Sequence, residues 1–447
     1  MKNNRNIDAF IEHYSRLILS PTNLKQAVLE DEKITKATIS YSPFSSTLHS
    51  GLPGIIFLAN EVNQQGILNK KATHIDSYIQ LLLENVKSNP TYDISLFAGL
   101  PGVGISLLCL KREDLFPVIH QINDVLFSLI DNFIEHQKME MGFPTKTQNF
   151  DLMYGLSGTL SYLLMCYKSN LYPEEKTTLT TYIKKIEASL VQRYVNPISF
   201  QGTSVPAWYI SSKNQMSEED IINYPFGNFN ISMSHGISGI ITVLTNSISM
   251  GIIQPGVKKL LKELVSFVVN NIQTSNGILS FPLMIPMNKN LKIATVKETV
   301  RFDSWCYGAP GILLALYKYA ALSKDQTLIE ICIKNFNYIN NQPMGLNSPS
   351  ICHGYAGLIS IIHAASKNIP GVQNVNPQLL DNLTSFYNPN LKLGFYNQEF
   401  TNSTHTVFYP DAGILTGVSG IILALISMKY DCKSKWEELF NISFESD

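Results

Sequence analysis

The sequence has no excess of charge of either sign. Its 447 residues include 34 Lys and Arg and 35 Asp and Glu, which gives a formal net charge of −1. The basic residues do not cluster, and they are not interleaved with aromatic side chains. A protein that holds a nucleic-acid backbone needs a basic surface to neutralise phosphates. We therefore expect no nucleic-acid partner.

Long hydrophobic runs are also missing. No apolar stretch reaches the roughly 20 residues that a membrane-spanning helix needs. Residues 1–8 begin with basic side chains, but no apolar core follows them, so this segment does not resemble a secretory signal. These two absences predict a cytoplasmic protein.

Cysteine is scarce, with 6 residues in the whole chain. In a compartment that keeps thiols reduced, so few cysteines are poor evidence for disulfides. Cys109, Cys166 and Cys332 lie within apolar helical patterns and are most simply small core residues. Cys306 and Cys352 stand in a different context, because each comes just before a repeated glycine.

A repeated step dominates the chain. Seven copies of Gly-x-x-Gly lead directly into apolar runs: Gly51–Gly54, Gly99–Gly102, Gly155–Gly158, Gly236–Gly239, Gly308–Gly311, Gly354–Gly357 and Gly417–Gly420. One such step is common before a helix, but seven in the same context indicate a repeated structural unit. The runs are apolar nearly all round, as buried helices are.

Amphipathic segments alternate with these buried helices. Helical spacing of apolar residues is clear in 122–133 and 257–268, and weaker in segments near 8–18, 74–87, 175–194, 326–340, 378–386 and 433–442. An inner ring of about seven helices inside an outer ring of about seven explains this alternation. We predict an all-α fold, an α/α toroid, in a single domain of residues 1–447. The inner helices should expose their first-turn N–H groups at one mouth of the ring.

Two stretches interrupt the helical periodicity. Residues 194–230 are rich in proline and aromatic side chains, which predicts a small irregular or β-containing insertion on the rim of the toroid. Residues 281–299 form a second irregular stretch, which precedes Cys306.

A metal site is the first chemical prediction. Cys306 and the pair Cys352-His353 lie one or two residues before the repeated glycine in two consecutive repeats, so adjacent helix starts should place them side by side. Helix N-termini favour the thiolate form that binds metal. Two thiolates and one imidazole suit a catalytic zinc ion that keeps a fourth position open for substrate.

An acid/base pair is the second chemical prediction. His235 stands directly before Gly236, at the equivalent rim position one repeat earlier. Alone it would more often be a structural histidine, but beside a zinc site it suits proton transfer near neutral pH. Asp151, four residues before Gly155, could orient that imidazole. An ordinary helix-start carboxylate is a close alternative for Asp151.

Taken together, these motifs resemble the lanthionine synthetase C family, the lantibiotic cyclases. The likeness runs over roughly residues 48–426 and is carried by Trp305-Cys306-Tyr307-Gly308, Cys352-His353-Gly354, Ser234–Gly239 and Asp151 ahead of Gly155. The resemblance implies a seven-over-seven helical toroid with one zinc ion held by Cys306, Cys352 and His353. It also implies an acid/base role for His235, a supporting role for Asp151 and a pocket role for Tyr307.

The sequence departs from the family pattern at one position. That pattern places an arginine four residues before the first zinc cysteine, whereas here Phe302 stands there and Arg301 lies one residue earlier. A pocket role for Arg301 would therefore require a bulge in the loop.

The resemblance further implies a reaction and its partners. The family adds peptide cysteine thiols to dehydroalanine or dehydrobutyrine, forming lanthionine or methyllanthionine. His235 would remove the thiol proton or deliver a proton to the α-carbon, and Tyr307 or Arg301 would stabilise the enolate oxygen. The implied substrate is a dehydrated precursor peptide. A lantibiotic dehydratase and an ABC exporter are the implied partners, in a biosynthetic complex at the membrane.

Two other functions stay open at this point. A non-catalytic relative could bind a thiol or peptide at the same zinc site, which would not need His235 or Asp151. A carbohydrate-active toroid would instead use paired rim carboxylates, for which Asp93, Asp151 and Asp411 are candidates. That function would leave the Cys-Cys-His set unused.

Overall fold

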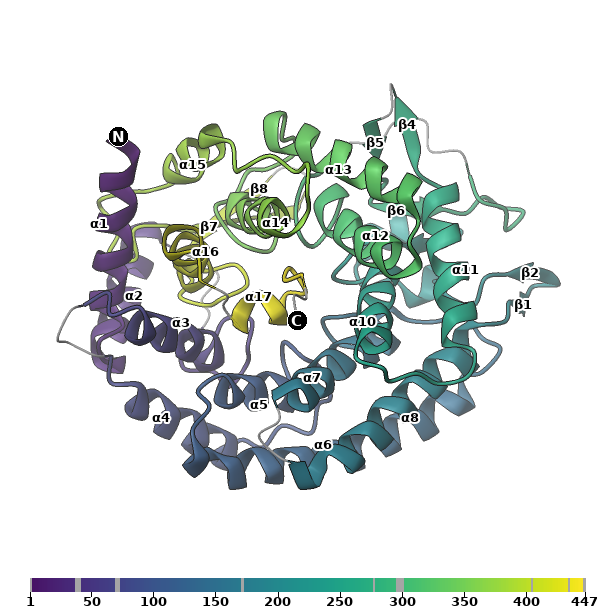
Figure 1. Ribbon diagram of the computed structural model, residues 1–447, viewed down its shortest axis with the longest axis horizontal. Coiled ribbons are helices and arrows are strands. Elements are labelled where there is room, and N and C mark those ends of the chain that lie inside the picture. The colour runs from purple at the N-terminus through teal and green to yellow at the C-terminus, as the bar shows by residue number, and fades with distance from the viewer. Residues whose placement is uncertain are drawn as a thin grey trace. The chain divides into compact units, whose positions relative to one another are not determined.

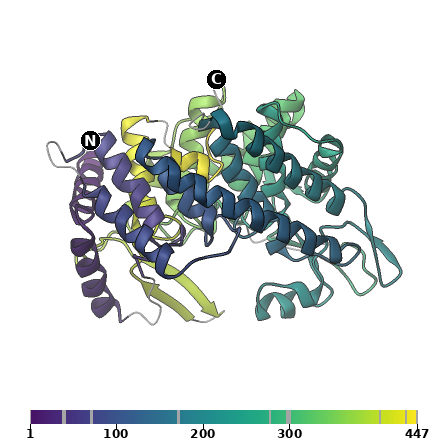
Figure 2. The ribbon, with the colours of Figure 1, turned by 90° about the horizontal axis from the view of Figure 1, so that it is seen from below.

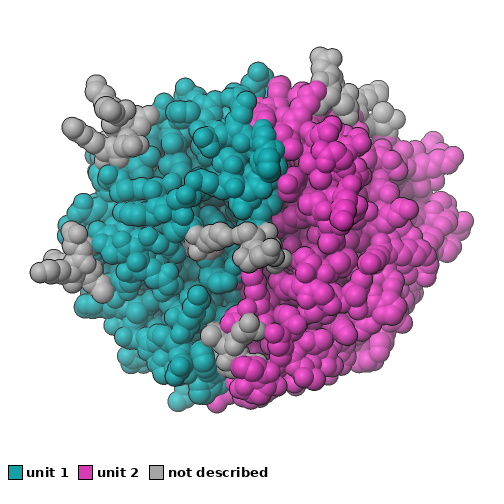
Figure 3. All heavy atoms as spheres, in the orientation of Figure 1, with its two compact units in different colours: residues 1–91, 97–119, 340–447 teal, residues 92–96, 120–339 magenta. Residues whose placement is uncertain are grey.

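The computed structural model describes residues 2–36, 42–68, 73–169, 173–275, 278–294, 301–402, 405–432 and 435–444. These residues form helices joined by short connections, with small two-stranded antiparallel sheets between some of them. They fall into two compact units (Figure 3): unit 1 comprises residues 1–91, 97–119 and 340–447, and unit 2 comprises 92–96 and 120–339. Within the described residues, no helix is both long and apolar enough to cross a membrane.

Unit 1 is built from buried helices covered by amphipathic ones. The buried helices pack in the order α14 (Tyr355–Asn368), α16 (Val418–Tyr430), α3 (Leu52–Gln64) and α5 (Leu100–Leu108). The outer helices α15 (Pro377–Thr384), α1 (Lys2–Leu17) and α4 (Ile75–Ser88) pack on α14, α16 and α3 (Figure 1). The unit also holds α2 (Pro21–Thr35) and α17 (Lys435–Leu439).

Unit 2 repeats this arrangement. Its buried helices are α7 (Leu156–Ser169), α10 (Ile237–Ser249) and α12 (Ala309–Ser323), with α10 packed between the other two. The outer helices are α8 (Lys176–Tyr194), α11 (Val257–Asn270), α13 (Gln326–Asn341) and most of α6 (Phe116–Met139). Each of the seven apolar runs after a Gly-x-x-Gly step is therefore a buried helix in the described chain, as the sequence predicted.

Burial follows the predicted pattern closely in α10 and α11. Helix α10 is buried on every side over Ile237–Thr245, whereas α11 buries one face, formed by Val257, Leu260, Leu261, Leu264, Val265 and Val268. Each such side chain contributes roughly 1.5–3 kcal/mol relative to an exposed position. The two-layer packing is therefore what stabilises each unit.

Short strands occur where helical periodicity fails. The predicted insertion, residues 194–230, contains the hairpin β1 (Ile198–Phe200) and β2 (Thr203–Val205), a short helix α9 (Glu218–Asn223) and β3 (Asn228–Asn230). Strand β6 (Met284–Pro286), within the second irregular stretch, pairs with β3 in antiparallel register. Residues 295–299 of that stretch lie outside the described residues. The two irregular stretches thus meet in one sheet of unit 2.

Several elements were not expected from the sequence. They are α2, the hairpin β4 (Gln273–Ser275) and β5 (Ile278–Ser280), and the hairpin β7 (Asn397–Asn402) and β8 (His405–Tyr409). Figure 2 shows β7 and β8 beside the N-terminal helices of unit 1, of which α2 contacts β8. Of the segment expected near 433–442, α17 covers Lys435–Leu439, and residues 433–434 lie outside the described residues.

The second glycine of the repeated step is required by close packing. A Cβ added at Gly311 would lie 2.2 Å from the Trp305 carbonyl oxygen, and one added at Gly420 would lie 2.0 Å from the Ile414 carbonyl oxygen. In each case the carbonyl belongs to the loop just before the helix. Glycine is therefore needed because the loop folds back onto the first turn of its own helix.

This folding back corrects one expectation. At several of the buried helices, first-turn N–H groups are bonded within their own loops rather than exposed at a mouth. Leu52 N donates to Ser45 O at 2.9 Å, Tyr355 N to Ser348 O at 3.0 Å, and Val418 N to Asp411 O at 2.8 Å. The loop carbonyls satisfy donors that an isolated helix would leave to solvent.

Candidate functional site

The loops before the buried helices share one design. In each loop the third residue before the repeated glycine is apolar and fully buried: Leu48, Leu96, Leu152, Met233, Trp305, Ile351 and Ile414 are all 0% exposed. The two residues that follow are chemically diverse. They are His49-Ser50, Phe97-Ala98, Met153-Tyr154, Ser234-His235, Cys306-Tyr307, Cys352-His353 and Leu415-Thr416. Of the predicted site residues, only Asp151 and Arg301 lie outside these pairs.

Backbone hydrogen bonds join neighbouring loops within each unit. In unit 2, Leu152 N donates to Ser234 O at 3.1 Å, and Met233 N donates to Cys306 O at 3.2 Å. In unit 1, Cys352 N donates to Leu415 O at 3.0 Å, and Leu415 N donates to His49 O at 3.1 Å. These bonds hold the variable pairs of adjacent loops in register. Side chains that are distant in sequence are thereby placed beside one another.

His235 and Asp151 form the predicted pair in unit 2. His235 Nδ1 lies 2.7 Å from Asp151 Oδ2, and the two side chains are 16% and 0% exposed. Asp151 Oδ1 also accepts from the N–H groups of Tyr154 at 2.6 Å and Gly155 at 2.8 Å. An ionised carboxylate can only accept, so Nδ1 of His235 must donate. The lone pair of the neutral ring is then on Nε2.

Tyr154 is a neighbour of this pair that the sequence reasoning missed. Its ring stacks on His235 with centroids 5.6 Å apart and planes 24° apart, and the residue is 38% exposed. It comes directly before Gly155, as His235 comes before Gly236. Alignment of the seven repeats by their first glycine would have identified it.

Tyr307 is a second aromatic neighbour of His235, from the loop before α12. Its ring centroid is 6.2 Å from that of His235, and its hydroxyl accepts from Nδ2 of Asn230 at 3.3 Å. Burial raises the pKa of Tyr307 well above its usual value, so the phenol stays protonated and can donate a hydrogen bond. Asn230, at the end of β3, was also missed, because nothing in its local sequence sets it apart.

Arg301 is engaged with Asp303 of its own segment and with Tyr338 of α13. Its guanidinium donates to both carboxylate oxygens of Asp303, at 2.9 and 2.6 Å, and lies 4.7 Å from the ring centroid of Tyr338. Asp303 in turn pairs with Gly308 in a β-bridge. In this arrangement Arg301 braces the loop that carries Cys306. A direct role in the pocket stays a prediction.

The predicted metal ligands are divided between the units. Cys306 belongs to unit 2, is 7% exposed, and has its Sγ 3.6 Å from Ser304 Oγ. Cys352 and His353 belong to unit 1, are half-buried, and offer a sulfur and a ring nitrogen within 4.8 Å of each other. The Cys-Cys-His donor set fits zinc, which prefers thiolate and imidazole ligands.

The three cysteines that the sequence predicted to be core residues differ from the metal-binding set. Cys109, Cys166 and Cys332 are 4%, 2% and 0% exposed, as expected for small core residues. Burial raises the pKa of Cys166 to about 12, so its thiol is protonated and inert at neutral pH. These thiols are not candidates for metal binding.

Comparison with known proteins bears on the fold and the family. A curated relative, "Nisin biosynthesis protein NisC" of Lactococcus lactis subsp. lactis, is 26% identical over 427 residues, covering 93% of this chain and 94% of the relative. A solved structure, "Nisin cyclase", matches with a TM-score of 0.71 at 23% identity, covering 94% of this chain and 97% of that one. This match confirms the predicted fold class, an α/α toroid.

The family assignment rests on a third comparison. The sequence profile of the family described as "Lanthionine synthetase C-like protein" matches residues 42–441, nearly the whole chain. This range includes all seven repeated steps, the His235–Asp151 pair and the predicted metal ligands. The chain belongs to the lanthionine synthetase C-like family.

Proposed function

We propose that this chain is a zinc-dependent lanthionine and methyllanthionine cyclase. Its substrate would be a dehydrated lantibiotic precursor, in which peptide cysteine thiols add to dehydroalanine or dehydrobutyrine. The observation that carries the proposal is the His235–Asp151 pair at 2.7 Å. A protein that merely bound a thiol would need the metal ligands but not a buried carboxylate that orients an imidazole.

Cys306, Cys352 and His353 would hold the zinc ion. When bound there, zinc would supply Lewis-acid chemistry that lowers the pKa of a substrate thiol and makes it a nucleophile at neutral pH. Two thiolates balance the charge of Zn²⁺, and the neutral imidazole adds none. Cys306 and Cys352 occupy equivalent positions, two residues before the glycine of their loops, and His353 directly follows Cys352.

His235 would move the proton. Addition of the thiol to the β-carbon places charge on the amide oxygen, and the α-carbon must then gain a proton. With Nδ1 held by Asp151, Nε2 of His235 can accept the thiol proton and donate it to the α-carbon. The buried carboxylate stabilises the imidazolium that forms between these two transfers.

Tyr307 would stabilise the charge on the amide oxygen. It is held by Asn230 and stays protonated, so its hydroxyl can donate to a developing enolate. Arg301 is committed to Asp303 and would act through the loop that carries Cys306 and Tyr307. The protein thus provides a proton carrier and a hydrogen-bond donor on two adjacent loops of unit 2.

Partners follow from the chemistry of the substrate. The alkene in a dehydro residue is made by removing water from serine or threonine, so a lantibiotic dehydratase would act before this chain. An ABC exporter would act after it, and membrane association would arise through that complex. These partners stay predictions from the family resemblance.

The carbohydrate-active alternative is less well supported. Asp93 Oδ1 accepts from Ser95 N at 2.8 Å, and Asp411 accepts from Gly413 N at 2.7 Å and from Thr416 Oγ1 at 2.5 Å. Each carboxylate therefore caps the loop that contains it. Asp151 is likewise held, by two N–H groups and His235.

Metal analysis combined with a cyclisation assay tests the proposal. The assay peptide carries one dehydroalanine and one cysteine, and the uncatalysed rate is subtracted. Wild type should hold one zinc per chain, and Cys306→Ala should lose both zinc and at least about 1,000-fold in rate, since one ligand of three is gone. Cys432→Ala, a half-buried thiol outside the loops, should keep both. Purified wild type without tightly bound zinc would refute the proposal.

A further inference from the structure

A cavity beside the candidate site is lined by residues of unit 2 alone. It has a volume of about 700 Å³ and is formed by residues 92–94, one face of α6, the loop at Gln148 and Asn149, and Tyr154. Tyr154 also stacks on His235, with ring centroids 5.6 Å apart. The cavity therefore begins one aromatic residue away from the proposed proton carrier.

The lining combines one carboxylate with two accessible tyrosines. Asp93 is the only acidic or basic residue among the nine described residues that line the cavity. Tyr92 is 72% exposed and Tyr154 is 38% exposed, so both can be reached from solvent. A carboxylate beside accessible aromatic rings attracts a cation, both by its charge and through the π electrons of the rings. These features favour a basic side chain as the ligand.

The segment that carries the carboxylate is held in place. Asp93 Oδ1 accepts from Ser95 N at 2.8 Å, which fixes the carboxylate through one of its oxygens. The next carbonyl along the chain, Ile94 O, accepts from Thr159 Oγ1 of α7 at 2.7 Å. Groups that are already ordered lose little entropy when a ligand binds, so this segment is suited to binding.

Amide side chains of the lining suit a peptide backbone. Asn132 of α6 and Gln148 are exposed at the cavity, and each amide offers both donors and an acceptor. Asn149 is held by Glu140, with Nδ2 2.9 Å from Oε2. The N–H and C=O groups of any peptide can pair with such amides, so the choice between residues is left to Asp93.

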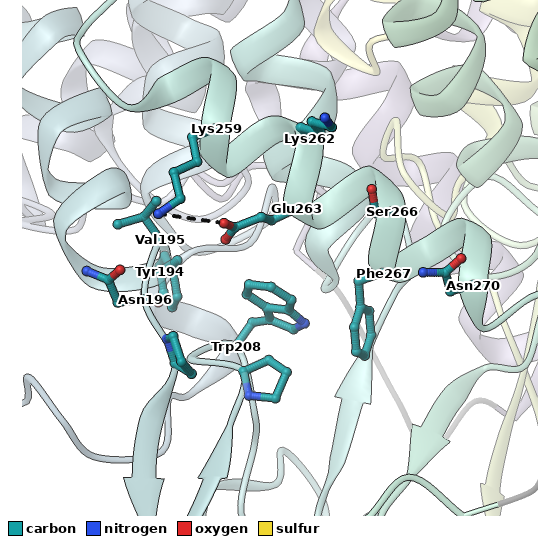
Figure 4. Close-up of a pocket in the computed structure, with 12 residues that line it drawn as sticks. Tyr194, Val195, Asn196, Trp208, Lys259, Lys262, Glu263, Ser266, Phe267 and Asn270 are labelled. Atoms are coloured by element: carbon teal, nitrogen blue, oxygen red, sulfur yellow. Dashed lines mark ion pairs between the residues drawn. The ribbon is translucent and has the colours of Figure 1, made fainter.

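A second cavity of unit 2 carries the opposite charge. It has a volume of about 670 Å³, and its lining includes Lys259, Lys262 and Glu263 of α11 (Figure 4). Lys259 and Glu263 lie 3.9 Å apart and offset each other, which leaves one basic residue in excess. Attraction of a cation is therefore a property of the cavity at Asp93 and not of unit 2 in general.

We propose that the cavity at Asp93 is a subsite for a basic residue, lysine or arginine, of the substrate peptide. The cation lies against the carboxylate of Asp93 and the ring of Tyr92, while the peptide backbone pairs with the amides. The inference rests on the proposed function, which supplies the peptide. It adds the class of residue that the substrate carries near its reacting centre.

The place of that residue in the peptide follows from the position of Tyr154. The α-carbon that gains a proton must come within roughly 3 Å of Nε2 of His235. Tyr154 separates this point from the cavity, and an extended peptide advances about 3.3 Å per residue. The basic residue therefore stands about two to four residues from the dehydro residue.

Peptides that differ at one position test the subsite. The assay peptide is made with lysine, norleucine or glutamate at the third residue from its dehydroalanine, the middle of that range. In wild type, KM should be about 3- to 10-fold lower for the lysine peptide than for the norleucine peptide, and highest for the glutamate peptide. The kcat values should be similar, because the subsite does not touch the reacting atoms. High salt should reduce the preference.

Variants of Asp93 separate its charge from its structural bond. Asp93→Asn keeps an oxygen that can accept from Ser95 N, so it should raise KM for the lysine peptide about 2- to 5-fold and leave KM for the norleucine peptide unchanged. Asp93→Lys should favour the glutamate peptide over the lysine peptide. The matched control Glu263→Gln, at a carboxylate of the cavity in Figure 4, should keep the wild-type preference.

Two changes at Tyr92 test the aromatic part of the subsite. Tyr92→Leu should raise KM for the lysine peptide about 2- to 5-fold, whereas Tyr92→Phe keeps the ring and should behave like wild type. The norleucine peptide shows whether the loss is specific for a cation. An equal loss for the lysine and norleucine peptides would mean that Tyr92 contributes only apolar contact, which would overturn its role beside the cation.

Direct binding separates this inference from the cyclase proposal. Cys306→Ala, in which turnover should be negligible, is titrated with the lysine and norleucine peptides. Tighter binding of the lysine peptide, lost when Asp93→Asn is added, supports the subsite even if wild type never closes a ring. Equal binding of the two peptides, or a preference that Asp93→Asn keeps, overturns the subsite and leaves the cyclase proposal intact. Binding of a soluble chitin trisaccharide that Tyr92→Leu abolishes, without a preference for lysine, would also overturn it, because the cavity would then be a sugar site.

Discussion

The loop before α10 in unit 2 and the loop before α16 in unit 1 have the same construction but different chemistry. Each begins with a fully buried apolar residue, Met233 or Ile414, and each ends in glycine at a helix start. The residue just before that glycine is His235 in one and Thr416 in the other. His235 bonds Asp151 of a neighbouring loop, whereas Thr416 bonds Asp411 of its own loop.

This difference separates what holds the fold from what performs chemistry. The buried residue, the glycines and the loop-to-loop backbone bonds recur in both units and support packing. The two residues between them vary from Phe97-Ala98 to Cys352-His353. The proposed function therefore uses the two positions of each loop that vary, and changes at His235 should affect activity more than stability.

The largest expected effect comes from the histidine itself. His235→Ala should lower kcat about 100- to 10,000-fold, because His235 carries the proton in the proposed reaction. Zinc content and the midpoint of unfolding should stay near wild type. The corresponding change in unit 1, Thr416→Ala, should leave kcat unchanged. If His235→Ala kept a kcat within a few fold of wild type, His235 would not carry the proton, and the two loops would not differ in function.

A glycine substitution tests the scaffold side of the comparison. Gly308 has φ 99°, and a Cβ there would lie 1.8 Å from Phe302 O, whereas Gly142 has φ 84° with open space around it. We expect Gly308→Ala to lower the free energy of unfolding by roughly 3 kcal/mol or more, and Gly142→Ala by about 1 kcal/mol. Denaturant titration measures both. Similar values for the two variants would mean that the close approach in the loop is not needed.

Buried carboxylates offer a second contrast between the units. Asp151 in unit 2 accepts three hydrogen bonds, whereas Glu437 in unit 1 is 8% exposed and burial raises its pKa to about 7, with Glu61 adding to the rise. The folded state thus binds this proton more tightly than the unfolded state. The contribution of Glu437 to the free energy of unfolding is therefore complete below about pH 4.3 and is lost as the pH rises to about 7.

Replacing Glu437 should remove that decline. At pH 8, Glu437→Gln should be more stable than wild type by about 1–3 kcal/mol, and near pH 4 the two should be alike. Thermal unfolding across pH 4–8 measures the difference. The control Glu113→Gln, at an exposed position, should shift stability little at any pH. A stabilisation that is equal at both ends of the range would contradict the assigned cause.

The smallest expected effect comes from the residue stacked on His235. Tyr154→Leu keeps an apolar contact but loses the ring stacking, so kcat should fall about 2- to 10-fold with little change in zinc content. Tyr319→Leu, near the C-terminal end of α12, should have no effect. An unchanged kcat in Tyr154→Leu would mean that Asp151 alone orients His235.

Much of the fold could be predicted because its signals are local. The repeated glycines and apolar runs marked every buried helix, and the spacing in α11 named its buried face residue by residue. Helix α2 was missed because its amphipathic pattern is weak, and β7–β8 because their sequence lacks clear alternation. The prediction that the first-turn N–H groups would be exposed was wrong at several helices. A loop that folds back to accept hydrogen bonds from them leaves no signal in the spacing of apolar residues.

The candidate site was predicted in part. His235 and Asp151 stood out by residue type and position, and the structure joins them. Tyr154 and Asn230 did not stand out, because an aromatic ring or an amide near a helix start has many ordinary uses. Arg301 was assigned to the pocket by resemblance, but its geometry follows from Asp303 and Tyr338, which a pattern does not reveal.

By itself, the sequence determined the buried helices, their glycine starts and the loop positions that carry reactive side chains, because these depend on neighbours within one or two turns. Only the tertiary structure decided which of those side chains meet. His235 and Asp151 are 84 residues apart, and Ser234 and Cys306 are 72 apart. Their contacts arise from hydrogen bonds between loops and from packing between helices, which act across space and leave no mark on the local sequence.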